Sequence, residues 1–301
     1  MADNLKIHKK KTWFTDQEQV VLIPEERLKA VQRLIRLARR RLLISVFRCS
    51  EKTILAELTD ALRRKVEVHT LVTPRAKGGK LRLNELGSLL ESMGAKVHRY
   101  PDQVVKYHAK YLVVDEGPAM VASLNFTKKC FRRTCDFLQI SFDPGVVAGL
   151  TRLFESDCRQ AQNLLPLDLN DRLIVGPDRA RVQLTELLQS ACKSIHIIDS
   201  KAGDADILTL LKAKKAAGVD VQILNDSALG ELTSHGKLIL VDDSTAVFGS
   251  ISLSTLSLDF RRELAIKVQD PGCVSRLVEF FESLVKAKSS GDKGIVVPAS
   301  P

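Results

Sequence analysis

The sequence predicts an α/β protein made of two similar halves, each a mixed β-sheet flanked by helices. Two observations predict it. Amphipathic and apolar segments alternate along the chain, and a His-x-Lys-x4-Asp pattern occurs twice, at His108–Asp115 and again 127 residues later at His235–Asp242. Alternating helices and apolar strands are typical of sheets covered by helices. We expect the halves to pack about a pseudo-two-fold axis, with a ligand site in the cleft between them.

The length and composition suit such a protein. A chain of 301 residues can bury a sizeable core, as one large domain or as two domains of about 150 residues. A composition of 45% hydrophobic and 27% charged residues is ordinary for a globular protein. The first residues carry charge without the apolar core of a secretory signal. No apolar run approaches the ~20 residues that span a bilayer. These features favour a cytoplasmic protein, with peripheral contact to a membrane left open.

The first half begins with a helix at 25–40, because Leu28, Val31, Leu34 and Ile35 recur at helical spacing after Pro24. A short apolar run at 42–47 suits a buried strand. A helix at 54–64, a strand at 66–72, a basic loop at 74–79, a helix at 81–93 and a strand at 96–100 follow.

The second half repeats most of this order. It has helices at 179–192 and 206–217 and strands at 195–199 and 219–224, but no counterpart of the basic loop, third helix and next strand. Each half closes with its motif strand, two more strands and a helix. The two further strands are expected at 120–124 and 137–142 in the first half, and at 246–251 and 264–268 in the second.

These segments divide the chain into five parts. We expect an N-terminal basic segment at 1–24, a first half at 25–163, a linker at 164–171, a second half at 172–287 and a C-terminal tail at 288–301.

The repeated motif carries groups suited to phosphate chemistry. On a strand, His108 and Lys110 would share one face, whereas Asp115 would point to the other face or sit at the strand end. The same parity holds in the second copy. Two imidazoles in one cleft can act as nucleophile and proton donor, because His titrates near neutrality. Two lysines can hold phosphate oxygens.

Other polar residues repeat at the same offset. Hydroxyl and amide groups that could hydrogen-bond a phosphate there are Ser123, Asn125, Ser250 and Ser252. Asp136 and Glu263 also correspond, and each carboxylate could orient a histidine through its second ring nitrogen.

This constellation resembles the phospholipase D superfamily, whose signature HxKx4Dx6GSxN occurs twice. The resemblance covers nearly the whole chain and implies phospholipase D-like halves that transfer phosphodiesters through a covalent phosphohistidine, with no obligatory metal or cofactor. It implies the catalytic set His108, Lys110, Asp115, His235, Lys237 and Asp242. Departures are Ala122 in place of Gly and Ser252 in place of Asn. Which histidine attacks stays open, with a preference for His108, whose half has the complete Ser-x-Asn.

Charge and cysteines bear on partners. A net charge of +10 and a pI near 9.3 favour an anionic partner. The basic helix Arg27–Arg41 could contact lipid or nucleic acid, but a charge run of this kind is more often a solvated helix face. The cations just after the first motif are better placed to hold a polyanion: Lys128, Lys129, Arg132 and Arg133. The six scattered cysteines indicate reduced thiols rather than a metal site. Homodimer formation stays open.

Three functions remain on sequence grounds. The first is a phosphoric diester hydrolase or phosphatidyltransferase that acts on phospholipid head groups. The second is a phosphodiesterase of DNA or RNA, which the charge favours but the low aromatic content of 5% does not. The third is a scaffold that binds nucleic acid or membrane without catalysis. We rank the lipid enzyme narrowly first.

Overall fold

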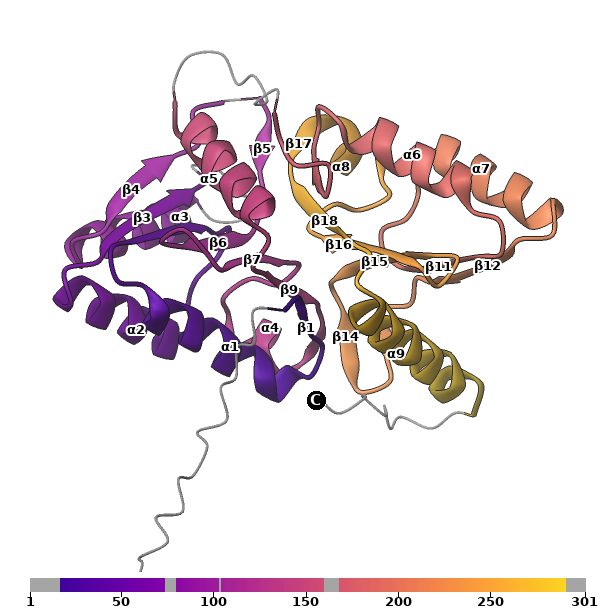
Figure 1. Ribbon diagram of the computed structural model, residues 1–301, viewed down its shortest axis with the longest axis horizontal. Helices are drawn as coiled ribbons and strands as arrows, with labels where there is room; N and C mark the ends of the chain where they lie inside the picture. The colour runs from indigo at the N-terminus through magenta and orange to yellow at the C-terminus, as the bar shows by residue number, and fades with distance from the viewer. Residues whose placement is uncertain (1–16, 74–79, 103, 160–167, 291–301) are drawn as a thin grey trace, which may run out of the picture.

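The computed structural model describes residues 17–73, 80–102, 104–159 and 168–290. Two lobes follow one another along the chain, and in each a β-sheet has helices on both faces (Figure 1). This confirms the expected α/β architecture. The basic loop expected at 74–79 lies outside the described residues, as does the first half of the linker expected at 164–171.

The first lobe is built on a sheet that has seven strands within the described residues, in the order β1-β9-β7-β6-β2-β3-β4. β2, β3 and β4 are parallel, whereas β6, β7, β9 and β1 pair antiparallel in succession. The strands are β1 (Gln19–Val21), β2 (Arg41–Ser45), β3 (Glu67–Val72), β4 (Lys96–Arg99), β6 (Tyr111–Val114), β7 (Ala119–Ala122) and β9 (Leu138–Ser141).

The second lobe repeats this sheet without a counterpart of β4. In its described part the order is β10-β18-β16-β15-β11-β12, with β11 and β12 parallel and the others antiparallel. The strands are β10 (Leu173–Val175), β11 (Ser194–Ile198), β12 (Asp220–Leu224), β15 (Lys237–Val241), β16 (Thr245–Gly249) and β18 (Leu264–Val268). The duplication therefore extends from the motif to the strand order.

Helices cover both sheets. In Figure 1, α1 and α2 lie on one face of the first sheet and α5 on the other, while α6 and α7 lie opposite α9 on the second. Within the described residues, no helix is long and apolar enough to span a membrane. The helices are α1 (Pro24–Leu37), α2 (Lys52–Arg63), α3 (Lys80–Ser92), α4 (Lys128–Arg132), α5 (Pro144–Cys158), α6 (Ala180–Ser190), α7 (Ala205–Ala216), α8 (Thr255–Phe260) and α9 (Pro271–Ser290).

A shared hydrophobic core joins the lobes. The ring of Phe137, just before β9, lies 5.7 Å from that of Phe248 in β16 and 5.9 Å from that of Phe280 in α9, measured between ring centroids. The cluster to which they belong draws residues from both sheets and from α5. Burial of this apolar surface fixes the lobes against each other, so residues contributed by both can form one site.

Two short parallel bridges also cross between the lobes. β5 (Lys106–Tyr107) pairs with β17 (Arg261–Arg262), and β14 (Leu232–Ser234) pairs with β8 (Thr134–Cys135). β14 also forms a hairpin with β13 (Ala228–Leu229). β5 and β14 each lead into a motif, so the bridges are reciprocal. Such reciprocity agrees with a two-fold relation, although the axis itself stays a prediction.

The ends of the halves differ from expectation. β1 forms the sheet edge inside the segment expected as 1–24, and α9 runs to Ser290, past the expected start of the tail at 288. The first helix ends at Leu37 rather than 40, because the backbone N–H groups of the next basic residues donate to Asp115.

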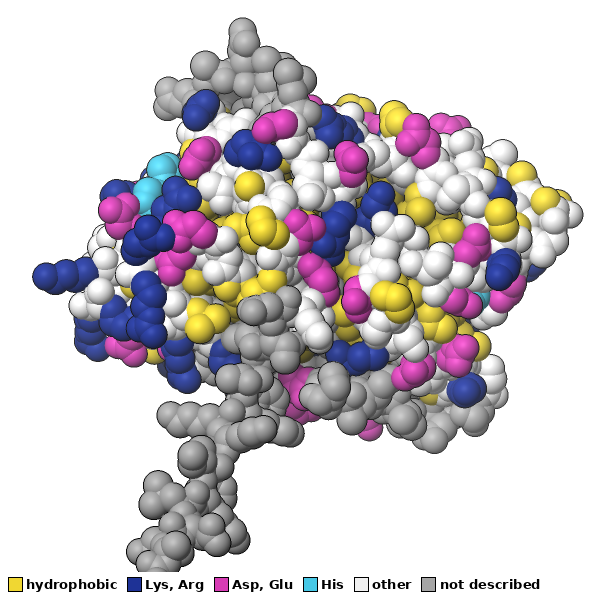
Figure 2. All heavy atoms as spheres, in the orientation of Figure 1, with side chains coloured by type: hydrophobic (Ala, Val, Ile, Leu, Met, Phe, Trp, Pro, Cys, Tyr) yellow, Lys and Arg dark blue, Asp and Glu magenta, His cyan; other side chains and the backbone are white. Residues whose placement is uncertain are grey.

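The basic helix is only partly a solvated face. Arg27 is fully buried, and Arg36 and Arg40 form ion pairs with Glu57 and Glu116. On the face drawn in Figure 2, Lys and Arg side chains gather over the first lobe, around α1 and α2. The prediction of a solvated helix face is therefore wrong for Arg27, whose buried guanidinium donates to the carbonyl of Thr134.

Candidate active site

Both motif histidines lie between a short bridging strand and a strand of the large sheet. His108 follows β5, and His235 follows β14. The expectation that His108 and Lys110 lie on a strand is wrong, because β6 begins only at Tyr111. The backbone here bonds instead to the other lobe: the His108 N–H donates to the Arg262 carbonyl at 2.8 Å. These cross-lobe bonds place each imidazole at the junction.

The second motif has a glycine at its centre for a steric reason. The Gly236 N–H donates to the Cys135 carbonyl at 2.7 Å. A Cβ at this position would lie 2.8 Å from that oxygen and 2.8 Å from Ser123 Oγ. The first motif has Ala109 instead, so the two junctions are not packed equally tightly.

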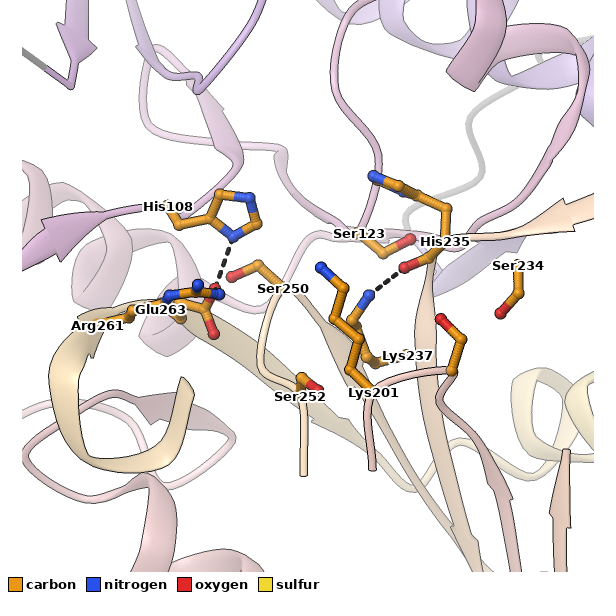
Figure 3. Close-up of a pocket in the computed structure, with 11 residues that line it drawn as sticks. His108, Ser123, Lys201, Ser234, His235, Lys237, Ser250, Ser252, Arg261 and Glu263 are labelled. Atoms are coloured by element: carbon orange, nitrogen blue, oxygen red, sulfur yellow. Dashed lines mark hydrogen bonds and ion pairs between the residues drawn. The ribbon is translucent and has the colours of Figure 1, made fainter. Parts of the chain in front are cut away.

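Each histidine takes its carboxylate partner from the opposite half. Glu263 Oε1 lies 2.6 Å from His108 Nδ1 (Figure 3), and Asp136 Oδ1 lies 2.9 Å from His235 Nδ1. The sequence offset indicates that Asp136 and Glu263 are equivalent, but it does not reveal this exchange. With Nδ1–H donated to the carboxylate, each Nε2 is left as the reactive nitrogen.

Asp136 is held as an anion. Ser123 Oγ donates to its Oδ1 at 2.6 Å, and Thr134 Oγ1 donates to its Oδ2. Burial alone would raise the pKa of Asp136, but His235 and Arg27 outweigh it and lower that pKa. Arg27 donates to the carbonyl of Thr134 at 2.6 Å, so this buried guanidinium from α1 also fixes the loop that carries Asp136.

Glu263 has the opposite electrostatic balance. Its side chain is 1% exposed and accepts from Ser257 Oγ and from His108. Burial raises the pKa of Glu263, although the Ser257 hydrogen bond and Lys110 act the other way. Arg261 Nη1 is 3.9 Å away. The two orienting carboxylates therefore differ in how readily they ionise.

His108 is surrounded by cations. Burial lowers its pKa well below the usual value, and Lys110 and Arg261 add to the effect. Its side chain is still 22% exposed, towards the pocket. At neutral pH the imidazole is neutral, and its Nε2 accepts a hydrogen bond from Lys110 Nζ at 3.2 Å.

The two lysines lie inward of the histidines. Lys110 is 1% exposed, and its Nζ donates to the His108 carbonyl at 2.7 Å and lies 3.2 Å from His108 Nε2. Lys237 Nζ donates to the His235 carbonyl. Burial lowers the pKa of Lys110 to about 7 and also lowers that of Lys237. An anion bound between them would favour both ammonium forms.

A pocket of about 100 Å³ lies where these groups meet. It is smaller than the roughly 300–1,000 Å³ of most small-molecule sites, so it would enclose a phosphate group but not a whole substrate. Both histidines line it, with Lys237 and Glu263 (Figure 3). Sequence reasoning missed further lining residues, which carry no repeated signature: Ser200, Lys201, Ser234 and Arg261.

Of the four expected phosphate-binding residues, three line the pocket: Ser123, Ser250 and Ser252. Asn125 is buried and does not line it, and Asn125 Oδ1 has no hydrogen-bond partner among the described residues. Ser252 Oγ donates to Asp199 Oδ2 at 2.8 Å. Ser252, which is shorter than the Asn expected at this position, therefore has a hydrogen-bond partner within the second half.

Asp115 and Asp242, both expected in the catalytic set, lie outside the pocket and bind backbone groups instead. Both adopt left-handed backbone conformations, with φ of 46° and 53°, and neither lines the pocket. Asp115 accepts three backbone N–H groups from 39–41, and Asp242 accepts three from 192–194. They fix the strand ends, as parity predicts.

One mixed group could in principle ligate a metal. Donor atoms of Cys130, Asp136 and His235 lie within 4.8 Å of one another. Both oxygens of Asp136 already accept hydrogen bonds from His235, and each takes a further hydroxyl donor. The group as it stands is a hydrogen-bonded histidine–carboxylate pair beside a thiol.

With this geometry in hand, the chain can be compared with known proteins. Residues 31–158 match the model of a family described as "Cardiolipin synthase, PLD-like domain". None of the curated proteins matches the chain by sequence.

Two solved structures share its fold. Phosphatidylserine synthase from Haemophilus influenzae Rd KW20 has a TM-score of 0.70 at 13% identity, covering 91% of this chain and 87% of that one. Polyphosphate kinase from Porphyromonas gingivalis has a TM-score of 0.69 at 16% identity, covering 89% of this chain. This chain spans 50% of that kinase. Residues 31–158 are thus similar to a phospholipase D-like domain, and the two solved structures show that the fold is shared over most of the chain.

Proposed function

We propose that this protein is a phospholipase D-type enzyme that hydrolyses or transfers phosphodiesters, with phospholipid head groups as substrates. The observation that carries the chemistry is the crossed arrangement of two histidines, each bonded to a carboxylate of the other half, around one phosphate-sized pocket. Such a pair of imidazoles supplies a nucleophile and a proton donor to the same phosphorus.

In the first step His108 Nε2 attacks phosphorus, and the bond between phosphorus and the leaving oxygen breaks. His235 gives its proton to that oxygen, so the head-group alcohol departs and a phosphohistidine remains. The low pKa of His108, caused chiefly by burial, favours the neutral nucleophile. The Asp136 anion stabilises the protonated His235 that this step requires.

In the second step the roles reverse. His235, now neutral, takes a proton from water or from an acceptor alcohol, whose oxygen attacks phosphorus. The bond between phosphorus and His108 Nε2 breaks and the site is restored. Water gives hydrolysis, and an alcohol gives transfer. Lys110 and Lys237 would hold the non-bridging oxygens throughout, with Ser123 and Ser250 as further donors.

Two similarities support a lipid substrate. The matching family model is described by a cardiolipin synthase, and the fold of a phosphatidylserine synthase covers most of this chain and of its own. The second candidate is a nucleic-acid phosphodiesterase. It is favoured by the net charge of +10 and by the exposed cations Lys128, Lys129, Arg132 and Arg133, which lie on and just after α4.

The test offers the purified protein anionic phospholipid vesicles, DNA and RNA, all with EDTA because the proposed mechanism needs no metal. His108→Ala and His235→Ala are compared with His69→Ala, which removes an imidazole that does not line the pocket. We expect head-group release from vesicles by wild type and by the control only. Turnover of nucleic acid alone would exclude the lipid substrate. Activity in both His108→Ala and His235→Ala would exclude the mechanism. If wild type turns over none of the substrates, a non-catalytic scaffold that binds nucleic acid or membrane is favoured.

A further inference from the structure

The bridge between β5 and β17 places two cations opposite each other beside the pocket. Lys106 and Arg261 are registered partners in this parallel pair, so their side chains emerge on the same face. Like charges placed directly opposite on paired strands destabilise a sheet. Arg261 lines the pocket next to Glu263, below His108 (Figure 3).

The fold does not require this charge pair. The reciprocal bridge between β8 and β14 has Thr134 opposite Thr233, at the positions equivalent to Arg261 and Lys106 by the offset of 127 residues. Two neutral residues thus serve the same backbone role on the His235 side. The repulsive pair on the His108 side must have another use.

A third cation and an aromatic ring extend this cluster. Arg48 Cζ lies 5.5 Å and Lys106 Nζ 5.0 Å from the centroid of Phe47, whose ring packs edge-on to His108 at 4.7 Å. A ring attracts cations but does not neutralise them. In the part of the chain that the structure describes, no carboxylate forms an ion pair with Lys106 or Arg48. Burial and the neighbouring Arg261 lower the pKa of Lys106.

The charges at the site are only partly matched: Asp136 and Glu263 are bonded to the histidines, Glu263 also lies 3.9 Å from Arg261, and Lys106 and Arg48 form no ion pair within the described residues. A phosphodiester carries a single negative charge, and Lys110 and Lys237 already flank the histidines. We propose that Lys106, Arg261 and Arg48 form a second anion subsite on the His108 side, which binds a second phosphate group of the substrate. This inference rests on the proposed function, which places the phosphate that is cleaved between the two histidines. It implies that the substrate carries two phosphate groups.

Binding is tested without turnover. Calorimetry compares glycerol bisphosphate with glycerol monophosphate on wild type, on Lys106→Thr/Arg261→Thr and on Lys212→Gln/Lys215→Gln. The double threonine variant copies the reciprocal bridge, and the control removes two exposed lysines of α7. Wild type and control should prefer the bisphosphate about tenfold or more, the size of one charge-assisted hydrogen bond, and the threonine variant should lose the preference. Equal binding of both ligands by wild type, or a preference kept by the threonine variant, overturns the inference.

Folding is checked by circular dichroism, and the single variant Lys106→Thr provides a milder change that should lose part of the preference. Without ligand the double threonine variant should melt at a higher temperature than wild type, because a repulsive pair is removed. A lower melting temperature with an unchanged ligand preference would mean that the cations stabilise the fold instead.

Turnover then separates the sources of the second phosphate. Bis(p-nitrophenyl) phosphate measures phosphodiesterase activity on a substrate with a single phosphate. If wild type does not hydrolyse it, the proposed function is contradicted, whereas the binding result is unaffected. Phosphatidylglycerol phosphate is compared with phosphatidylglycerol, and a thymidine dinucleotide with and without a 5′-phosphate. A preference of about tenfold in the lipid pair is expected. A preference only in the dinucleotide pair supports the subsite and moves the substrate to nucleic acid, whereas none in either pair overturns the subsite.

Discussion

The two motif histidines have equivalent carboxylate partners, but the two pairs lie in different electrostatic settings. Asp136 is fully buried among two hydroxyl donors and His235, close enough to Arg27 for its pKa to be lowered. Glu263 has the partly exposed Arg261 at 3.9 Å, and burial outweighs it and raises the pKa of Glu263. One half of the site holds a stable anion, whereas the other holds a carboxylate closer to neutrality beside a neutral imidazole.

This difference agrees with the proposed division of roles, because the geometry of the two histidines is kept while their surroundings differ. The backbone bridges that set each histidine are reciprocal, and only the residues around them have diverged. A neutral His108 ringed by cations suits nucleophilic attack on an anion, and an imidazole beside a fixed anion suits proton donation. These settings support the proposal that His108 is the nucleophile, which is also the preference drawn from the sequence.

The largest effect should come from removing either histidine, and the two variants should fail at different steps. With bis(p-nitrophenyl) phosphate, His108→Ala should lose about 10⁴-fold in kcat/KM and show no burst, because no covalent bond forms. His235→Ala should release one equivalent of nitrophenolate and then stall as a phosphohistidine, since this leaving group needs no acid. Stopped-flow absorbance and intact mass measure both. A burst in His108→Ala and none in His235→Ala would reverse the assignment.

The carboxylates should differ next. Asp136→Asn should lower kcat/KM about 10³-fold, because a neutral amide cannot stabilise the His235 imidazolium. Glu263→Gln should cost only about tenfold, since the amide oxygen still accepts from His108 Nδ1–H and the carboxylate is already biased towards neutrality. Steady-state kinetics on the soluble diester give both ratios, with circular dichroism as the folding control. Equal losses would mean that the two settings are equivalent.

The pH dependence should follow Lys110. Its pKa of about 7 means that the ammonium is present below that pH and is lost above it, so kcat/KM should fall as pH rises from 7 to 9. His108, with a pKa lowered by burial, stays neutral across this range. Lys110→Met should lower activity and remove the decline above pH 7. An unchanged alkaline decline in that variant would assign the titration to another group.

The smallest effect on catalysis should come from the two aspartates of the turns. Asp115→Asn and Asp242→Asn keep a residue that tolerates left-handed φ but weaken the acceptor for three N–H groups, so each should lose about 1–2 kcal/mol of unfolding free energy. The kcat/KM should change less than threefold in both. Urea unfolding and the diester assay measure these values. A loss of activity with intact stability would return the aspartates to the catalytic set.

Much of this architecture is visible in the sequence. The repeated spacing identifies His108 and His235, the offset identifies Asp136 and Glu263 as equivalents, and the alternation of segments predicts both sheets. Parity also predicts that Asp115 points away from the histidines. These features follow from hydrophobic periodicity and from the spacing of the repeat, both of which can be read from a single sequence.

Other features could not be read from the chain. The exchange of carboxylates depends on β5, β8 and β17, strands of two residues, which are too short to leave a periodic pattern. Arg27 looks like the other basic residues of its helix, and only the packed structure shows it buried. Arg261 has Thr134 at its equivalent position, so repeat analysis passes over it.

The crossed pairs make the proposed activity depend on both halves of the chain. Each half carries a histidine whose carboxylate belongs to the other, so neither half contains a complete catalytic pair. A chain severed between residues 159 and 168 would consist of two catalytically silent fragments, and any turnover recovered on mixing them would count correctly joined pairs. Under the proposed function, turnover would therefore measure how well the two halves assemble, and a substitution in one half would act on the histidine–carboxylate pair of the other.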